Sequence, residues 1–153
     1  MMEELETSFE LNESELHLYS RQILLDGWDI DAQEKLKLAN VLIVGCGGIG
    51  CTTAELLARA GVGQISLIDA DTIEVSNLQR QIGFTGLDVG FYKSEILAKR
   101  LRLINPHIQI EFYTEKLSQN NAKHLIASQD LVLDGCDNFE TRYLVNQVCK
   151  SEN

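Results

Sequence analysis

Four glycines in one short loop are the residues of this chain whose types and spacing first indicate chemistry. Gly45, Gly47 and Gly50 form a Gly-x-Gly-x-x-Gly pattern, with Gly48 inside it, directly after the apolar run 41–44. In a strand–loop–helix unit the first glycine allows a tight turn, the second lets backbone approach a phosphate, and the third lets helix pack on strand. Amides at the start of the following helix then face an anion, which the helix dipole also favours. The loop therefore predicts a nucleotide site, without saying which nucleotide.

A carboxylate stands where a ribose hydroxyl would be bound. Asp69 ends the second expected strand, nineteen residues after Gly50, and an acid at that place accepts hydrogen bonds from ribose hydroxyls. These residues fit NAD, FAD and an adenine nucleotide equally well. A purely structural alternative, in which the glycines only ease a turn beside a capping aspartate, also stays open.

The elements that must position these residues alternate between strand and helix patterns. Helices are expected at 13–25, 29–38, 49–60, 89–104 and 119–127 and from 138 onward, and strands at 40–44, 64–69, 107–113 and 131–133, with an irregular stretch at 70–88. Alternation with short connections implies an α/β fold with a mostly parallel sheet covered by helices on both faces. We therefore expect a Rossmann-like domain, preceded by an N-terminal helical segment.

Composition and charge exclude several function classes. The net charge is −10, and residues 1–15 hold six glutamates and no basic residue, so we expect residues 1–12 to be an acidic, mobile leader. An acidic chain without a basic stripe is a poor candidate for binding nucleic acid. No apolar run approaches the roughly 18–20 residues that cross a bilayer, and the basic start of a signal peptide is absent. We expect a cytoplasmic protein with reduced cysteines and no metal site built from cysteine and histidine.

The stretch that follows Asp69 discriminates between the nucleotides. From residue 13 to its end, the chain resembles the MoeB/ThiF family of ATP-dependent adenylating enzymes, which are related to ubiquitin-activating enzymes. Five motifs carry the resemblance, in order and at family spacing: Tyr19-Ser20-Arg21-Gln22-Ile23, the glycine loop, Ser76-Asn77-Leu78-Gln79-Arg80-Gln81 followed by Lys93, Ile104-Asn105-Pro106, and Asp134-Gly135-Cys136-Asp137-Asn138. The resemblance implies that residues 13–153 are an ATP-binding adenylation domain. Its substrate would be the C-terminal carboxylate of a ubiquitin-like sulfur-carrier protein in molybdopterin or thiamin biosynthesis, and its products an acyl-adenylate and pyrophosphate.

The resemblance also implies roles for individual residues. Arg80 and Lys93 would neutralise phosphate charge, Arg21 would reach the site of the partner subunit in a homodimer, and Asp137 would hold Mg²⁺. The nucleotide-binding set would be Gly45, Gly47, Gly48, Gly50, Asp69, Ser76, Asn77, Gln79, Arg80, Lys93 and Asn138. Outside the family pattern, Arg21 and Lys93 would be ordinary surface cations, and Asp137 and Asn138 a helix cap.

The chain also departs from the family pattern. Tyr92 stands where relatives usually carry a proline before Lys93, and one hypothesis is that it alters the loop that aims this lysine. Full-length relatives continue with two Cys-x-x-Cys pairs for structural zinc and with a loop that receives the carrier tail. We therefore expect zinc only in a longer protein.

Two other functions stay open. An NAD(P)-dependent oxidoreductase would use the glycine loop and Asp69 but leave Arg21, Arg80 and Asp137 without a task. A non-catalytic nucleotide-binding or scaffold member of the same family is the other alternative.

Overall fold

The computed structural model describes residues 10–152, so most of the expected leader at 1–12 lies outside the described residues, as does Asn153. The last two leader residues are packed, because Leu11 is buried and Asn12 caps the first helix. The elements are α1 (Glu13–Leu18), α2 (Ser20–Ile23), α3 (Ile30–Leu38), β1 (Asn40–Val44), α4 (Gly48–Ala60), β2 (Gln64–Ile68), the 3-10 turns η1 (Val75–Asn77) and η2 (Gly86–Asp88), α5 (Lys93–Ile104), β3 (Gln109–Tyr113), α6 (Ala122–Ile126), β4 (Leu131–Asp134) and α7 (Phe139–Glu152).

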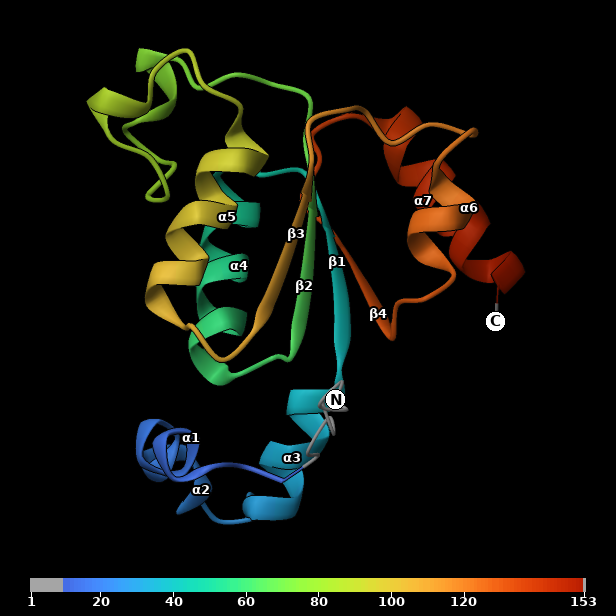
Figure 1. Cartoon of the computed structure of the whole chain (residues 1–153). Helices are drawn as coiled ribbons and strands as arrows, with labels where there is room; N and C mark the ends of the chain where they lie inside the picture. Colours follow the sequence, from blue (N-terminus) through green and yellow to red (C-terminus); the bar gives the residue numbers. More distant parts are fainter. Residues whose placement is uncertain (1–9, 153) are drawn as a thin grey trace, which may run out of the picture.

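The four strands form one parallel sheet in the order β3-β2-β1-β4. Side chains of a strand alternate between its faces, and the core is divided accordingly. Val41 and Ile43 of β1 pack with α4 and α5, whereas Leu42 and Val44 pack with α6 and α7. Figure 1 shows these two helix layers on opposite sides of the sheet, and α1 to α3 below it. The expected α/β fold with an N-terminal helical segment is confirmed.

The order of the strands creates a topological switch point beside β1. From β1 the chain adds β2 and then β3 on one side, and it later returns to place β4 on the other side. In open α/β sheets ligands bind outside the carboxyl ends of the strands at such a point. The loops after β1 and β4 are therefore where a ligand site is expected.

Helix α5 begins four residues later than the pattern predicts. The expected helix at 89–104 starts at Lys93, because Gly90 has a left-handed φ of +91° and residues 90–93 pair with the chain near Ile73 instead. The amide of Gly90 donates to Ile73 O at 2.8 Å, and that of Lys93 to Asp71 O at 3.0 Å. These tertiary hydrogen bonds replace the first helical turn, and they place Lys93 at the start of α5.

No helix within residues 10–152 has both the length and the apolar character that crossing a bilayer requires.

Candidate functional site

A cleft opens at the switch point, at the carboxyl ends of the strands. It has a volume of about 1360 Å³ and is lined by the loops that follow β1, β2, β3 and β4 and by the start of α7. Gly45 shapes its floor: its φ is +92°, and a Cβ there would lie 3.0 Å from the carbonyl of Gly135. The loops after β1 and β4 therefore touch backbone to backbone, which only a residue without a side chain allows.

The three remaining glycines of the loop have different tasks. Gly47 and Gly48 line the cleft, so backbone is exposed to a ligand there. Gly50 is buried and does not line it; a Cβ at this position would lie 1.9 Å from Gly45 O. Gly50 therefore supports the loop from behind, and its packing partner is the loop itself as well as the strand.

Asp69 is held rigidly at the edge of the cleft. Its Oδ2 accepts a hydrogen bond from the amide of Cys46 at 2.7 Å, and its Oδ1 one from the amide of Asp71 at 2.7 Å. Burial raises the pKa of Asp69, and the two backbone hydrogen bonds oppose that rise. Each carboxylate oxygen keeps a second lone pair. A fixed acceptor with free lone pairs suits the recognition of a ribose hydroxyl.

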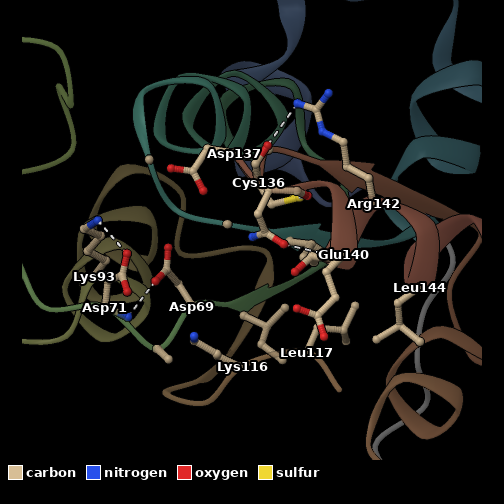
Figure 2. A pocket seen from close by; sticks show the side chains of 18 of the residues that line it. Asp69, Asp71, Lys93, Lys116, Leu117, Cys136, Asp137, Glu140, Arg142 and Leu144 are labelled. Atoms are coloured by element: carbon tan, nitrogen blue, oxygen red, sulfur yellow. Dashed lines mark hydrogen bonds and ion pairs between the residues drawn. The ribbon is translucent and has the colours of Figure 1, made fainter. Parts of the chain in front are cut away.

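Lys93 reaches the cleft from the first turn of α5. Its side chain is only 9% exposed, and Nζ lies 3.3 Å from Oδ2 of Asp71, which is 67% exposed (Figure 2). An ion pair this open to water is weak, so an anionic ligand can compete for the lysine. Tyr92 has φ −66° and ψ 135°, the backbone conformation that a proline would take. In this structure Tyr92 thus leaves Lys93 lining the cleft, and Asp71 is a partner that the sequence did not indicate.

The segment around η1 contributes one expected cation and one unexpected amide. Arg80 lines the cleft and is exposed, and its Nη1 donates to Ser76 O at 3.1 Å. Gln81 also lines the cleft, is 3% exposed, and has a buried Oε1 without a hydrogen-bond partner among residues 10–152. A buried acceptor left unpaired costs about 1–3 kcal/mol. A donor on a ligand or a water would relieve that cost, so Gln81 is a further candidate site residue.

Three other predicted contacts do not line the cleft. Ser76 Oγ donates to Glu74, and Asn77 accepts the Glu74 amide at 3.0 Å and is buried, while Gln79 is exposed. Asn77 and Glu74 form a capping box that fixes η1. In this structure Ser76 and Asn77 shape the turn that carries Arg80.

The loop after β4 supplies the opposite wall of the cleft. Asp137 is exposed, and its carboxylate has no hydrogen-bond or ion-pair partner within the described part of the chain. Asn138 lines the cleft and also caps α7, because its Oδ1 accepts from the amide of Thr141 at 2.9 Å. Arg142, which the sequence did not single out, donates to Cys136 O at 3.0 Å. Figure 2 shows Asp137 and Arg142 on this wall, across from Asp69 and Lys93.

Arg21 is the one predicted catalytic residue that the structure places elsewhere. It lies on α2, whose neighbour Gln22 donates to Ala60 O at the end of α4. Helix α4 starts at the cleft and has thirteen residues, a length of about 20 Å at 1.5 Å per residue. Arg21 is exposed and has no ion-pair partner among residues 10–152. It therefore cannot act on a ligand in the cleft of its own chain.

A family model supports the assignment that the motifs suggested. The model described as the ThiF family matches residues 19–153. The chain belongs to the ThiF family. Among its relatives, the sulfur carrier protein adenylyltransferase of Thermus thermophilus is 44% identical over 132 residues, which is 86% of this chain and 49% of the relative. The molybdopterin-synthase adenylyltransferase of Salmonella typhimurium is 46% identical over 140 residues, 92% of this chain and 56% of the relative.

Solved structures show the same fold around a nucleotide. The Escherichia coli tRNA N6-threonylcarbamoyladenosine dehydratase TcdA, in complex with ATP, has a TM-score of 0.85 and 28% identity, covering 92% of this chain and 57% of that one. Escherichia coli MccB with AMPCPP and MccA has a TM-score of 0.80 and 35% identity, covering 89% and 42%. This chain thus spans about half the length of the curated relatives it matches.

Proposed function

We propose that the protein adenylates the C-terminal carboxylate of a ubiquitin-like sulfur-carrier protein. One observation carries the proposal: a single cleft at the switch point brings together the glycine loop, Asp69, Arg80, Lys93 and Asp137. Two relatives whose names specify a sulfur carrier protein or molybdopterin synthase as the adenylated partner support the substrate class. The TcdA complex supports ATP as the nucleotide.

In the proposed reaction a carboxylate oxygen of the carrier attacks the α-phosphorus of ATP. The bond from that phosphorus to the bridging oxygen breaks, and pyrophosphate leaves with the electron pair. Negative charge grows on the phosphates, so catalysis consists mainly of positioning and charge stabilisation. Arg80 and Lys93 line the same cleft as the glycine loop and supply cations to the phosphates, and Asp69 orients the nucleotide through its ribose.

The charges of the cleft support the proposal that a metal ion accompanies the nucleotide. Five acidic residues and four basic residues line it, so the chain alone does not offset a triphosphate. Asp137 has a carboxylate without a partner among the described residues, and a hard cation such as Mg²⁺ prefers such oxygens together with those of phosphate. Residues 10–152 contain no cluster of three or more metal-binding side chains, which suits Mg²⁺, since it keeps several waters and phosphate ligands. When bound, Mg²⁺ would neutralise phosphate charge.

Arg21 is proposed to act on the cleft of a second copy of the chain. Leu18 at the end of α1, and Leu24 and Leu25 directly after α2, are close to it in sequence and are 49%, 78% and 62% exposed. A cation among exposed leucines is typical of a surface that another protein covers. In a symmetric homodimer that surface would bring the partner subunit's Arg21 to the phosphates, as an arginine finger does in other phosphoryl chemistry.

Carrier-dependent exchange of labelled pyrophosphate into ATP tests the function. The complete gene product is assayed with a panel of ubiquitin-like carriers, including those of molybdopterin and thiamin synthesis, and the carrier that supports exchange identifies the pathway. Arg80→Ala and Asp137→Ala should each lower exchange at least 100-fold. Lys99→Ala is the control, because Lys99 is exposed and its one ion pair within residues 10–152 is with Glu95 on the same helix. No exchange with any carrier would favour the oxidoreductase or the scaffold, and unchanged exchange in both variants would remove the catalytic assignments.

Mixed dimers test the arrangement in trans. Arg21→Ala and Asp137→Ala subunits are each expected to be inactive alone, whereas a heterodimer of the two has one cleft with all its parts. It should recover up to half of the normal rate. Heterodimers that form but stay inactive would show that Arg21 does not act across the dimer.

A further inference from the structure

Two residues of the family motifs, Tyr19 and Asn105, lie at the far end of α4 from the cleft and have no task of their own in the proposed reaction. Tyr19 begins the motif that contains Arg21, and Asn105 is the centre of Ile104-Asn105-Pro106. Both side chains are buried, Tyr19 at 3% and Asn105 at 1% exposure. Although 86 residues separate them in sequence, Asn105 Nδ2 donates to Tyr19 OH at 2.7 Å.

This contact belongs to a polar joint at the end of α4, formed by Tyr19, Asn105, Gln22 and Gln33. Asn105 Nδ2 also donates to Ala58 O at 2.7 Å. Gln33, which is fully buried, donates to Ala60 O at 2.8 Å, and Gln22 donates to the same carbonyl at 2.7 Å. Ala60 O, at the end of α4, thus accepts from two side chains of the N-terminal segment, and Ala58 O accepts from Asn105 as well as from the Gly61 amide.

Backbone and side chains are in close contact at the joint. Gly61 caps α4 with a φ of +91°, and a Cβ there would lie 2.6 Å from Tyr19 Cζ and 2.7 Å from Gln33 Nε2. Gly63 is closer still to α3, since a Cβ there would lie 1.6 Å from Lys37 O. Packing this close, together with satisfied buried hydrogen bonds, specifies one orientation of α2 against α4.

The joint connects the arginine to the helices that build the cleft. Helix α4 begins at Gly48 and α5 at Lys93, both in the cleft, and their other ends are at the joint. Figure 1 shows α4 and α5 side by side between the upper loops and the N-terminal helices. Arg21 stands between Tyr19 and Gln22 in sequence, so the residues on either side of it are fixed to this pair of helices.

We propose that Tyr19 and Asn105 are positioning residues for Arg21. They fix the direction in which α2 presents this arginine to the cleft of the partner subunit. The inference rests on the proposed function, because it requires Arg21 to act in trans. An apolar anchor would hold α2 to the core, but hydrogen bonds with defined donors and acceptors also fix its rotation, and a guanidinium must be aimed to within about 1 Å.

Tyr19→Phe tests the inference with little change in packing, since the ring against Gly61 stays. Losing the hydroxyl should lower kcat of pyrophosphate exchange about ten- to a hundredfold, while KM for ATP stays within about twofold because the cleft is untouched. Tyr113→Phe is the matched control, because the one hydrogen bond of that hydroxyl in the described part of the chain is to Glu111 on the edge strand β3. Both are assayed in the complete gene product, with the carrier that supports exchange by the unaltered protein.

Placing the changes on chosen subunits separates positioning from a general loss of stability. With Tyr19→Phe on one subunit and Asp137→Ala on the other, the working cleft receives Arg21 from the subunit with an intact joint, so exchange should be near half of normal. With both changes on the same subunit, the working cleft receives its arginine from the altered joint. Exchange should then be at least tenfold slower. Equal rates in the two arrangements would overturn the inference.

Variants of Arg21 distinguish a wrong positioning role for Tyr19 from a wrong proposed function. In an Arg21→Ala background, Tyr19→Phe should cause no further loss; an additional tenfold loss would mean that the tyrosine acts by another route. If Arg21→Ala by itself leaves exchange unchanged, Arg21 has no part in the reaction, and Tyr19 and Asn105 cannot act by positioning it. If Tyr19→Phe does not fold, Gln33→Met, which removes one donor to Ala60 O, replaces it in the same comparison.

Discussion

Gly50→Ala should disable the cleft although Gly50 does not line it. Gly50 has ordinary helical backbone, so alanine brings no conformational strain; the problem is space. An added Cβ would lie 1.9 Å from Gly45 O and 2.9 Å from Gly45 C, both backbone atoms that cannot rotate away. Reaching the 3.4 Å of ordinary contact requires a shift of about 1.5 Å in the loop. We expect either that the whole glycine loop moves toward the cleft or that α4 moves away from β1.

The size of the effect follows from that displacement. Overpacking a close contact costs roughly 1–3 kcal/mol, and in a domain of about 150 residues each kcal/mol lowers the Tm by about 2–4 °C. The expected drop is therefore roughly 2–12 °C. A loop moved by more than 1 Å also loses a hydrogen bond from its amides to a phosphate. At roughly 1.5–3 kcal/mol for a bond to a charged group, ATP should bind about ten- to a hundredfold more weakly.

Both quantities can be measured on the 153-residue chain itself. Calorimetric titration with MgATP gives the affinity, and thermal unfolding gives the Tm. Gly86→Ala is the matched control, because nothing lies within 4 Å of a Cβ there and its φ is not positive. The control should keep its affinity and lose no stability. If Gly50→Ala binds ATP within twofold of the unaltered chain at an unchanged Tm, this contact does not fix the loop.

Three further predictions use the same chain. Tyr92→Pro should raise the free energy of unfolding, measured by urea titration, by about 0.4–1 kcal/mol and leave ATP binding unchanged. The reason is that φ of Tyr92 is already −66° and its amide has no acceptor among residues 10–152. Weaker ATP binding would show that the Tyr92 ring orients Lys93. Burial raises the pKa of Asp69, so its carboxylate lowers stability fully at neutral pH, and this penalty disappears as the pH falls through the raised pKa toward the ordinary value. ATP affinity should fall over the same range, whereas Asp69→Asn should bind weakly with no such dependence. A thiol reagent should label Cys136 and Cys149 before the buried Cys46 and Cys51, and burial also raises the pKa of Cys51 to about 11. MgATP should protect Cys136 but not Cys149 from the reagent. Peptide mass spectrometry measures the labelling of each cysteine.

Local patterns in the sequence were sufficient for most of the fold. The strand at 40–44 and the helix that ends at Gly61 follow from an apolar run, a helical period and a glycine, and the structure has β1 and α4 there with Gly61 in the left-handed conformation. Asp29 caps α3 as its type suggests, accepting from the amide of Ala32. These features depend on residues a few positions apart, so periodicity and capping rules reach them.

The start of α5 shows where such rules fail. The helical period continues back to residue 89, but pairing with the chain near Ile73 delays the helix to Lys93. Asp71 and Gln81 could not be assigned to the site for the same reason. One faces Lys93 across 22 residues, and the other is buried only because of how the loop folds over the cleft. The residues next to Asp71 and Gln81 in the sequence do not predict those contacts.

The sequence by itself thus determined most of the elements, the glycine loop, the carboxylate at Asp69 and the membership of the ThiF family. Only the tertiary structure decided which motif residues share a cleft and which do not. It put Lys93 and Asp137 in one cleft, and it put Arg21 beside the far end of α4, a helix about 20 Å long. The physical reason is that parallel strands bring their carboxyl ends together whatever the separation in sequence, while a helix carries its two ends apart.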